Sequence, residues 1–413
     1  MTFDNLGLSA DLLATVAQEG YTEPTPVQTA AIPLILAGRD VLAAAQTGTG
    51  KTAAFVLPIL ERLRPHANTA FSPARHPVRV LILTPTRELA VQVADAARTL
   101  SRSLPLRSAV VYGGTPMDPE IKALWGGIEI LVATPGRLLD HVGQRTVNLG
   151  QVEVLVLDEA DRMLDMGFIP DVRRIAALLP TARQTLLFSA TFSDEIRKLA
   201  REFLRNPQTV EVAARNSVAD NLTEILYPVD ERRKADLLVH LIRRDRMEQV
   251  LVFTRSKIGA SRLASYLERR GVSASAIHGD RSQAERERAL ADFKAGEIAV
   301  LVATDVASRG LDIEDLPYVV NFELPYEPQD YIHRIGRTGR AGASGIAISL
   351  ASPAEVEQLR GVQRLLRRAI PYQVVEEFLP DPDRGPEPVR RLEPGGRPVS
   401  RPTPRGRAAA AAR

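Results

Sequence analysis

Strand-length apolar runs alternate with helical patterns along most of the chain. The first half contains the runs VLAAA, VRVLILT, SAVVYGG, IEILVAT and VEVLVLD, and the second half contains EQVLVFT, ASAIHG, IAVLVAT and YVVNFEL. Runs that are apolar at nearly every position are typical of parallel strands buried on both faces, with helices between them. The pattern therefore predicts an α/β fold built on parallel sheets.

Parts of this pattern occur twice. VLILTPTREL begins at Val80 and VLVFTRSKIG at Val250, while LVAT begins at Leu131 and again at Leu301, so each pair is 170 residues apart. A third pair, VVYGG and SAIHGD, has almost the same spacing. Short Val/Leu strands can resemble one another by chance, but three pairs in the same order favour two similarly folded domains.

Composition places the domain boundaries. A polar stretch separates the strand-like runs QTVEV and TEILYPV, and beyond Phe378 the chain is rich in Pro, Gly and Arg with little to bury. The stretch from Arg64 to Pro77 is expected to be a surface loop. We therefore expect a first domain over residues 1–212, a linker over 213–222, a second domain over 223–375 and a disordered basic tail over 376–413.

Cysteine and charge narrow the possible functions. Because none of the 413 residues is cysteine, disulfides, thiolate catalysis and thiolate metal sites are excluded. The net charge of +3 is local, since residues 380–413 carry eight Arg against four acids. The opening residues lack the features of a signal peptide, and no apolar stretch of about 18 residues could span a bilayer. We expect a cytoplasmic protein without membrane contact.

The sequence AQTGTGKT, from Ala45 to Thr52, lies between a strand-like run and a helical run. Gly48 and Gly50 let backbone N–H groups turn onto phosphates at a helix N-terminus. Lys51 would reach the β and γ oxygens, and Thr52 would bind Mg²⁺. The context predicts a nucleotide-phosphate site, with an unliganded turn as the alternative.

A second run, VEVLVL, ends in Asp158, Glu159, Ala160 and Asp161. A buried strand thus brings carboxylates to the C-terminal edge of a sheet, where ligands of such folds bind. Asp158 would hold hydrated Mg²⁺, and Glu159 is the candidate general base for an attacking water. The alternative is an acidic helix N-terminus stabilised by the helix dipole.

Ten motifs in order decide the resemblance. They are GYTEPTPVQ at Gly20, AQTGTGKT at Ala45, PTRELA at Pro85, GG at Gly113, TPGR at Thr134, DEAD at Asp158, SAT at Ser189, VFTR at Val252, ATDVASRGLD at Ala303 and HRIGRTGR at His333. From Phe3 to about residue 370 the chain resembles the DEAD-box RNA helicases, most of all their bacterial RhlE-like branch. The resemblance implies two tandem RecA-like domains with ATP and Mg²⁺ as cofactors.

The resemblance also implies how the nucleotide is bound. Gln28 would read the adenine edge, which a carboxamide can bond at N6 and N7 together. Phe3 and Tyr21 would support the base, and Asp312 would take the ribose. The implied nucleotide-binding set is Phe3, Tyr21, Gln28, Ala45, Gln46, Thr47, Gly48, Thr49, Gly50, Lys51, Thr52 and Asp312.

Catalysis would draw on both domains. By resemblance, Arg337 and Arg340 are arginine fingers on the γ-phosphate and His333 orders the catalytic centre. Ser189 and Thr191 would couple ATP hydrolysis to strand opening, although they could instead cap the helix that begins near Ser193. The implied catalytic set is Lys51, Asp158, Glu159, His333, Arg337 and Arg340.

RNA would cross both domains. Small residues, hydroxyls and a few Arg form a reader of the sugar-phosphate backbone, which predicts little sequence preference and a choice of RNA through 2′-OH contacts. The tail would either add a salt-sensitive grip on RNA or be merely solvated. The RNA positions implied by the resemblance are Pro85, Thr86, Arg87, Gly113, Gly114, Thr134, Arg137, Gly279, Asp280 and Thr304.

The sequence thus predicts a monomeric ATP-dependent RNA helicase that unwinds or remodels short RNA duplexes or RNA–protein complexes. Ribosome assembly and RNA degradation are both compatible with this activity. A DNA-translocating helicase is one alternative, and an ATP-gated RNA clamp is another.

Overall fold

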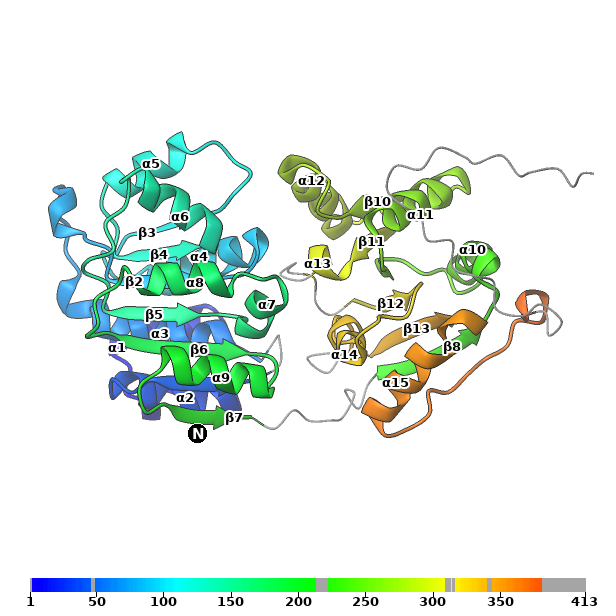
Figure 1. The fold of residues 1–413 in the computed structure, drawn as a ribbon, viewed down its shortest axis with the longest axis horizontal. Helices are drawn as coiled ribbons and strands as arrows, with labels where there is room; N and C mark the ends of the chain where they lie inside the picture. The colour runs from blue at the N-terminus through cyan, green and yellow to red at the C-terminus, as the bar shows by residue number, and fades with distance from the viewer. Residues whose placement is uncertain are drawn as a thin grey trace, which may run out of the picture.

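The computed structural model of the chain describes residues 2–45, 49–212, 222–308, 313, 316–339 and 344–380. Two α/β domains lie side by side, each built around one parallel sheet (Figure 1). This confirms the predicted fold class.

The first domain contains a seven-stranded sheet in the order β3-β4-β2-β5-β6-β1-β7, with every pairing parallel. Its strands are β1 (Val41–Ala44), β2 (Val80–Leu83), β3 (Ser108–Val111), β4 (Ile130–Ala133), β5 (Val154–Leu157), β6 (Gln184–Ser189) and β7 (Gln208–Glu211). The helices are η1 (Phe3–Leu6), α1 (Ala10–Gln18), α2 (Pro26–Leu36), α3 (Lys51–Leu63), η2 (Arg64–His66), η3 (Pro73–Arg75), α4 (Arg87–Leu100), α5 (Asp118–Trp125), α6 (Pro135–Gly143), α7 (Ala160–Asp165), α8 (Ile169–Ala176) and α9 (Asp194–Phe203).

Alternation along the strands divides the core of this domain in two. Val80 and Ile82 of β2 face helices α1 to α4, whereas Leu81 and Leu83 face helices α5 to α9. All four side chains are buried, because successive strand residues point to opposite faces and both faces are covered. This double burial explains why the strands are apolar at every position.

The second domain repeats the arrangement with the order β10-β11-β9-β12-β13-β8. Its strands are β8 (Leu222–Pro228), β9 (Val250–Thr254), β10 (Ala274–Ile277), β11 (Val300–Thr304), β12 (Tyr318–Asn321) and β13 (Gly345–Ala351). The helices are η4 (Glu231–Arg233), α10 (Lys234–Arg244), α11 (Lys257–Arg269), α12 (Gln283–Lys294), α13 (Asp305–Ser308), α14 (Pro328–Ile335), η5 (Pro353–Glu355), α15 (Val356–Leu366) and η6 (Glu376–Phe378). Strand for strand, this order matches β3-β4-β2-β5-β6-β1, so the predicted structural repeat is confirmed.

The boundaries differ from the prediction at two points. The expected linker falls mostly on residues 213–221, outside the described residues, but its last member, Leu222, begins β8. The expected tail starts at residue 376, yet Phe378 is buried, with its ring 5.5 Å from that of His240 and 4.7 Å from the Arg233 guanidinium carbon. An apolar anchor after a polar stretch therefore extends the packed second domain to Phe378, and residues 381–413 lie outside the described part of the chain.

The described residues include no helix that is both long and apolar enough to cross a bilayer.

A buried ionic cluster positions the approach to α14. The ammonium of Lys234 is fully buried and contacts the carboxylate of Glu355, which also contacts the Arg255 guanidinium. The same carboxylate accepts the backbone N–H of Leu324 at 3.0 Å, in the segment between β12 and α14. Burial alone would raise the pKa of Glu355, but Lys234 and the other donors hold it below its ordinary value.

Replacing Glu355 with Gln should lower the melting temperature of the full chain at neutral pH by several degrees. The buried charge of Lys234 would keep only the half-exposed Glu231 carboxylate, 3.3 Å away, as its anionic partner, a loss of up to about 3 kcal/mol. Glu357→Gln is the matched control, because the Glu357 side chain is 75% exposed. A depressed folded-state pKa means that the stabilisation is present above the ordinary carboxyl pKa and is lost in acid. The gap between the two variants should therefore shrink on acidification, and equal melting temperatures at neutral pH would contradict the assignment.

Candidate active site between the domains

Neighbouring strands of the first sheet bring three motifs together. β5, β6 and β1 are adjacent and parallel, so the loops after their carboxyl ends share one edge of the sheet. These loops hold the segment before Lys51, the carboxylates from Asp158 onward, and the segment from Ser189 to Thr191. The sheet edge is where ligands of parallel α/β folds bind.

The described part of the phosphate loop is shaped by Gly50. This residue precedes α3 with a φ of +83°, in the left-handed region that favours glycine. A Cβ at this position would lie 2.4 Å from Nε2 of Gln28. Buried Lys51 follows, and its ammonium donates to the Ala45 carbonyl oxygen at 2.8 Å. The predicted members Gln46, Thr47 and Gly48 lie outside the described residues.

Gln28 connects this loop to the segment before α2. Its Oε1 accepts the Thr25 N–H at 2.9 Å, and its Nε2 donates to the Gly50 carbonyl at 3.1 Å. A carboxamide has two N–H donors and two acceptor lone pairs, so these contacts leave half of its capacity. Nearby in sequence, Phe3 and Tyr21 meet edge to face with ring centroids 6.4 Å apart. The adenine role of Gln28 stays a prediction.

Asp158 and Glu159 are both buried at the end of β5. Burial, and then the charge of Glu159, raise the pKa of Asp158 to about 7, while the Lys51 ammonium opposes the shift. Glu159 has a φ of +53° and its carboxylate pairs with the Arg162 guanidinium. Two neighbouring buried carboxylates repel each other, so a cation bound beside them is favoured.

The donor set matches Mg²⁺. Asp158 and Thr52 offer oxygen atoms, and the described residues contain no cluster of three or more His, Asp or Glu that could hold a metal. Mg²⁺ commonly takes only one or two protein groups and completes its shell with water and phosphate oxygens. A protein-only metal cage is not required here.

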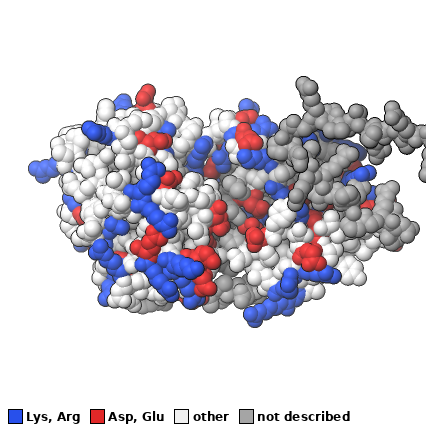
Figure 2. Space-filling model, viewed as in Figure 1, with Lys and Arg blue, Asp and Glu red and all other residues white. Residues whose placement is uncertain are grey.

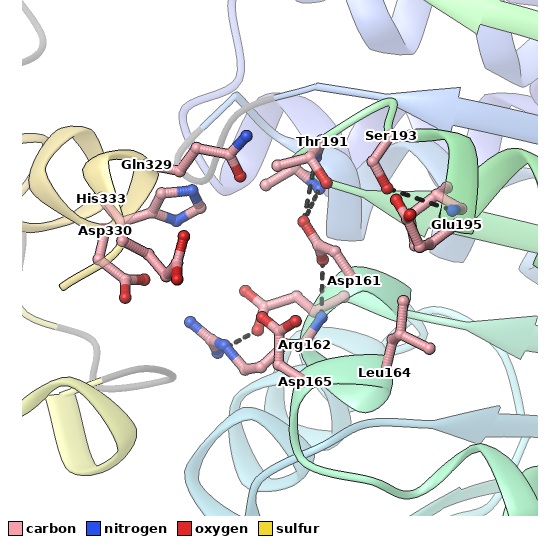
Figure 3. Close-up of a pocket in the computed structure, with 14 residues that line it drawn as sticks. Asp161, Arg162, Leu164, Asp165, Thr191, Ser193, Glu195, Gln329, Asp330 and His333 are labelled. Atoms are coloured by element: carbon pink, nitrogen blue, oxygen red, sulfur yellow. Dashed lines mark hydrogen bonds and ion pairs between the residues drawn. The ribbon is translucent and has the colours of Figure 1, made fainter. Parts of the chain in front are cut away.

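Asp161 connects the DEAD motif, which begins at Asp158, to the SAT motif, which begins at Ser189. The sequence did not predict this role. Its Oδ2 accepts the N–H groups of Ala190 and Thr191, each at 3.0 Å (Figure 3). The Thr191 N–H also lies 3.3 Å from Oγ of Ser189. The cap of α9 is Ser193, whose Oγ accepts the Ile196 N–H, so capping by Ser189 or Thr191 is wrong.

A cavity of about 570 Å³ lies between the two domains at this edge. From the second domain, α14 presents His333 toward the carboxylates of the first (Figure 3). Acidic side chains gather on both sides of the junction on the face that Figure 2 shows. The residues that line the cavity are Glu159, Asp161, Arg162, Leu164, Asp165, Ala190, Thr191, Ser193, Glu195, Ile196, Glu327, Gln329, Asp330 and His333.

Gln329 and Asp330 were missed by the sequence analysis. They precede His333 by four and three residues, and that spacing puts all three side chains on one helical face. The helical period around His333 would have found them.

The arginines of HRIGRTGR have different environments. Arg334 is buried and forms a two-pronged ion pair with Asp305 at 2.6 and 2.7 Å, so it anchors the turn internally. Arg337 is also buried, and its carbonyl accepts the Leu316 N–H at 3.1 Å. Arg340 and Asp312 lie outside the described residues.

The predicted RNA positions follow the carboxyl ends of five strands. Pro85, Gly113 and Thr134 follow β2, β3 and β4, while Gly279 follows β10 and Thr304 ends β11. The sheets therefore bring these positions to their ligand-binding edges, although this arrangement does not test contact with RNA.

Arg87 lies directly over Gly114. Gly114 has a φ of +90°, and a Cβ there would be 2.2 Å from Nη1 of Arg87. Beside them, Thr86 caps α4 by accepting the Leu89 N–H at 3.3 Å. The PTRELA motif that begins at Pro85 and the GG motif at Gly113 are thereby in contact.

Two other predicted RNA residues are engaged internally. Arg137 is buried, and its guanidinium donates to Glu120 at 2.7 Å and to the Thr115 carbonyl at 2.6 Å. Asp280 pairs with Lys257 at 2.6 Å. Arg137 therefore supports the loop after β3 in this structure.

The two domains also touch beside this edge. Arg286 of α12 and Glu88 of α4 form an ion pair at 2.6 Å, and both side chains are 11% exposed. Because Glu88 adjoins Arg87, the contact lies next to a predicted RNA position.

Comparisons with known proteins agree with this geometry. A DEAD/DEAH box helicase model matches residues 25–199, and a helicase conserved C-terminal domain model matches residues 233–342. The DEAD-box ATP-dependent RNA helicase CshA of Bacillus cereus is 44% identical over 367 residues, which cover 89% of this chain and 68% of that protein. The chain belongs to the DEAD-box helicase family. Its place in the RhlE-like branch stays a prediction.

Solved structures of one yeast relative bear on the domain arrangement. Dbp5 of S. cerevisiae bound to RNA and ADP BeF3 is 33% identical, with a TM-score of 0.79 over 91% of this chain and 95% of that one. A Dbp5 variant bound to Nup159, Gle1, IP6 and ADP is 30% identical, with a TM-score of 0.62 over 90% and 96%. The domains of this DEAD-box protein are thus arranged more nearly as in the RNA-bound relative.

Replacing Asp161 with Asn should uncouple the two motifs that it joins. Oδ2 of Asp161 accepts the N–H groups of Ala190 and Thr191, and Oδ1 accepts the Arg162 N–H at 3.0 Å, so an amide NH2 would face a donor in either orientation. Hydrogen bonds to a charged group are worth about 1.5–3 kcal/mol. We expect ATP turnover at saturating nucleic acid to fall roughly tenfold or more, with ATP binding retained. Asp171→Asn, at a half-buried side chain of α8 that does not line the cavity, is the control. Normal turnover in Asp161→Asn would contradict the coupling role.

Proposed function

We propose that this protein hydrolyses ATP to ADP and phosphate and uses the cycle to unwind or remodel short RNA duplexes or RNA–protein complexes. The observation that carries the proposal is the cavity in which the DEAD carboxylates face α14 of the second domain. A site divided between two domains acts only when they close, so ATP and RNA can control each other through closure.

Binding would begin at the phosphate loop. Lys51 now donates to the Ala45 carbonyl, and its flexible stem lets the ammonium move onto β and γ oxygens of ATP. Gln28 would use its remaining N–H and lone pair on adenine, while its present contacts fix the loop through Gly50. Thr52 and Asp158 would hold Mg²⁺, which supplies positive charge to the phosphate oxygens when bound.

Hydrolysis would need Glu159 to orient and deprotonate the attacking water. In this structure its carboxylate pairs with Arg162, which holds it at the wall of the cavity. Arg337 and Arg340 would neutralise charge on the transferring phosphoryl group, an effect worth about 10³ to 10⁵ in rate for arginine fingers. His333, on the opposite wall of the cavity, would order the centre.

RNA would bind across both sheet edges. Thr86, Thr134 and Thr304 offer hydroxyls, and Arg87 is held over Gly114 where it can meet a phosphate. Few of these groups can read base edges, so the proposed substrate is single-stranded or short duplex RNA of little sequence preference. We further propose a cytoplasmic monomer, with ribosome-assembly or RNA-degradation complexes as candidate partners.

Two other functions share this architecture. A DNA-translocating helicase would use the same phosphate loop and arginines, and an RNA clamp would use the same closure to hold RNA. The yeast relative of similar domain arrangement, whose structure contains RNA, favours RNA over DNA. Strand separation compared with the dwell time on RNA would distinguish unwinding from clamping.

Replacing Glu159 with Gln should stop turnover while ATP and RNA stay bound, because the amide cannot accept the proton of water. General-base losses are on the order of 10² to 10⁴ in rate. ATP hydrolysis and nucleotide binding would be measured in parallel, with the exposed Glu202→Gln as control. An unchanged rate for Glu159→Gln would show that another group is the base.

Nucleic-acid choice gives an independent test. Single-stranded RNA should stimulate ATP hydrolysis at least tenfold more than DNA of the same sequence, since 2′-OH contacts are lost with DNA. The assay compares initial rates at matched length and salt. Equal or greater stimulation by DNA would favour the translocase.

A further inference from the structure

The loop from Arg64 to Pro77 is fastened to the first domain by two side chains, those of His76 and Arg107. His76 is buried, and its ring contacts the Glu129 carboxylate on one side and the Ala70 carbonyl, at 2.7 Å, on the other. Arg107 donates to the Ala70 carbonyl at 2.7 Å and to the Gly126 carbonyl at 2.8 Å. Both sides of the loop are thus pinned against the turn before β4.

These contacts hold two aromatic rings at the surface. Phe71 is 96% exposed and follows Ala70, while Trp125 is 65% exposed and precedes Gly126. One guanidinium binds the carbonyls of Ala70 and Gly126, so the two aromatic residues adjoin backbone groups that share a single partner. Gly127 tightens the same contact, since a Cβ there would lie 2.8 Å from the backbone of Pro73. Because these rings are held at the surface and bury little area, packing within the domain does not explain why the residues are aromatic.

The charge around these rings is positive. The segment from Arg64 to Pro77 contains two Arg and two His but no acidic residue. Arg75, four residues after Phe71, and Lys122, three residues before Trp125, are both exposed, whereas Glu129 is buried against His76. Exposed aromatic rings among cations are the surface on which bases of single-stranded nucleic acid stack while phosphates meet the charges.

We propose that Phe71 and Trp125 form a second contact for single-stranded RNA, outside the site between the domains. The proposal rests on the proposed function in so far as RNA is the substrate. Phe71 lies in the segment before β2 and Trp125 in the segment before β4, whereas predicted RNA positions follow the same two strands. A four-residue strand spans roughly 13 Å, so RNA that fills only the main site does not reach the patch.

Trp125 itself reports the contact, because it is the only tryptophan in the chain. Single-stranded RNA of about 30 nucleotides should quench its fluorescence, and RNA of about 8 nucleotides should not. Phe71→Ala and Trp125→Ala should each weaken binding of the long RNA about 5- to 30-fold. Trp125→Phe should restore most of the affinity, since a ring remains. RNA-stimulated ATP hydrolysis with the short RNA should be unchanged in all three variants.

The controls separate stacking from other causes. Tyr372→Ala removes a ring that is 71% exposed on the second domain and should not alter affinity. Equal quenching by inorganic polyphosphate would overturn stacking and leave charge alone. Unchanged Trp125 fluorescence with long RNA, while RNA still stimulates ATP hydrolysis, would overturn the patch and leave the proposed function standing. Absence of RNA stimulation altogether would overturn the proposed function.

Discussion

A triphosphate can enter a cleft lined with carboxylates only when cations enter with it. Burial and like charge already raise the pKa of Asp158, and the opposite wall adds Glu327 and Asp330. The first domain offers Lys51 and the oxygen ligands for one metal ion, while its Arg162 is occupied by Glu159. On the prediction made for Arg337 and Arg340, further positive charge would come from the second domain. This electrostatic requirement would make catalysis depend on domain closure.

The need for positive charge from the second domain also gives a role to the connection that Asp161 makes between α7 and the loop after β6. Its carboxylate binds the backbone between Ser189 and Thr191, so any shift of α7 is passed to the loop after β6. That loop leads directly into α9 and lines the cavity opposite His333. A hydrogen-bonded segment with few ways to move can carry a change at the phosphates toward the domain junction. By linkage, RNA that favours closure must favour ATP binding by the same factor.

The sequence predicts the fold well because its strands are buried on both faces. Such strands need apolar residues at every position, and this signal is visible in β2 or β11 without any knowledge of their neighbours. The runs that form β6 and β13 were not singled out, although both lie inside their sheets. The boundaries of the linker and the tail were harder to predict, because Leu222 and Phe378 are held by residues that are distant in sequence.

The site residues, too, could be predicted where the signal is local in sequence and not where it depends on distant partners. Motif spacing locates Lys51, Asp158 and Glu159, because the chemistry of a phosphate loop and a carboxylate strand end is local in sequence. The limit is shown by Arg137 of α6, whose partner Glu120 lies seventeen residues away on α5, with strand β4 between them. Hydrogen-bond partners of that kind depend on tertiary packing, which no motif encodes.

The ion pair between Arg286 and Glu88 indicates how the geometry of domain closure could be controlled. Its members come from different domains, so the pair exists only in an arrangement like the present one. Both side chains are 11% exposed, and removing charges from water offsets much of their attraction. Such a pair adds little net stability but penalises misaligned closure, in which either charge would be buried alone. Closure of the correct geometry would then draw its free energy mainly from ATP and RNA.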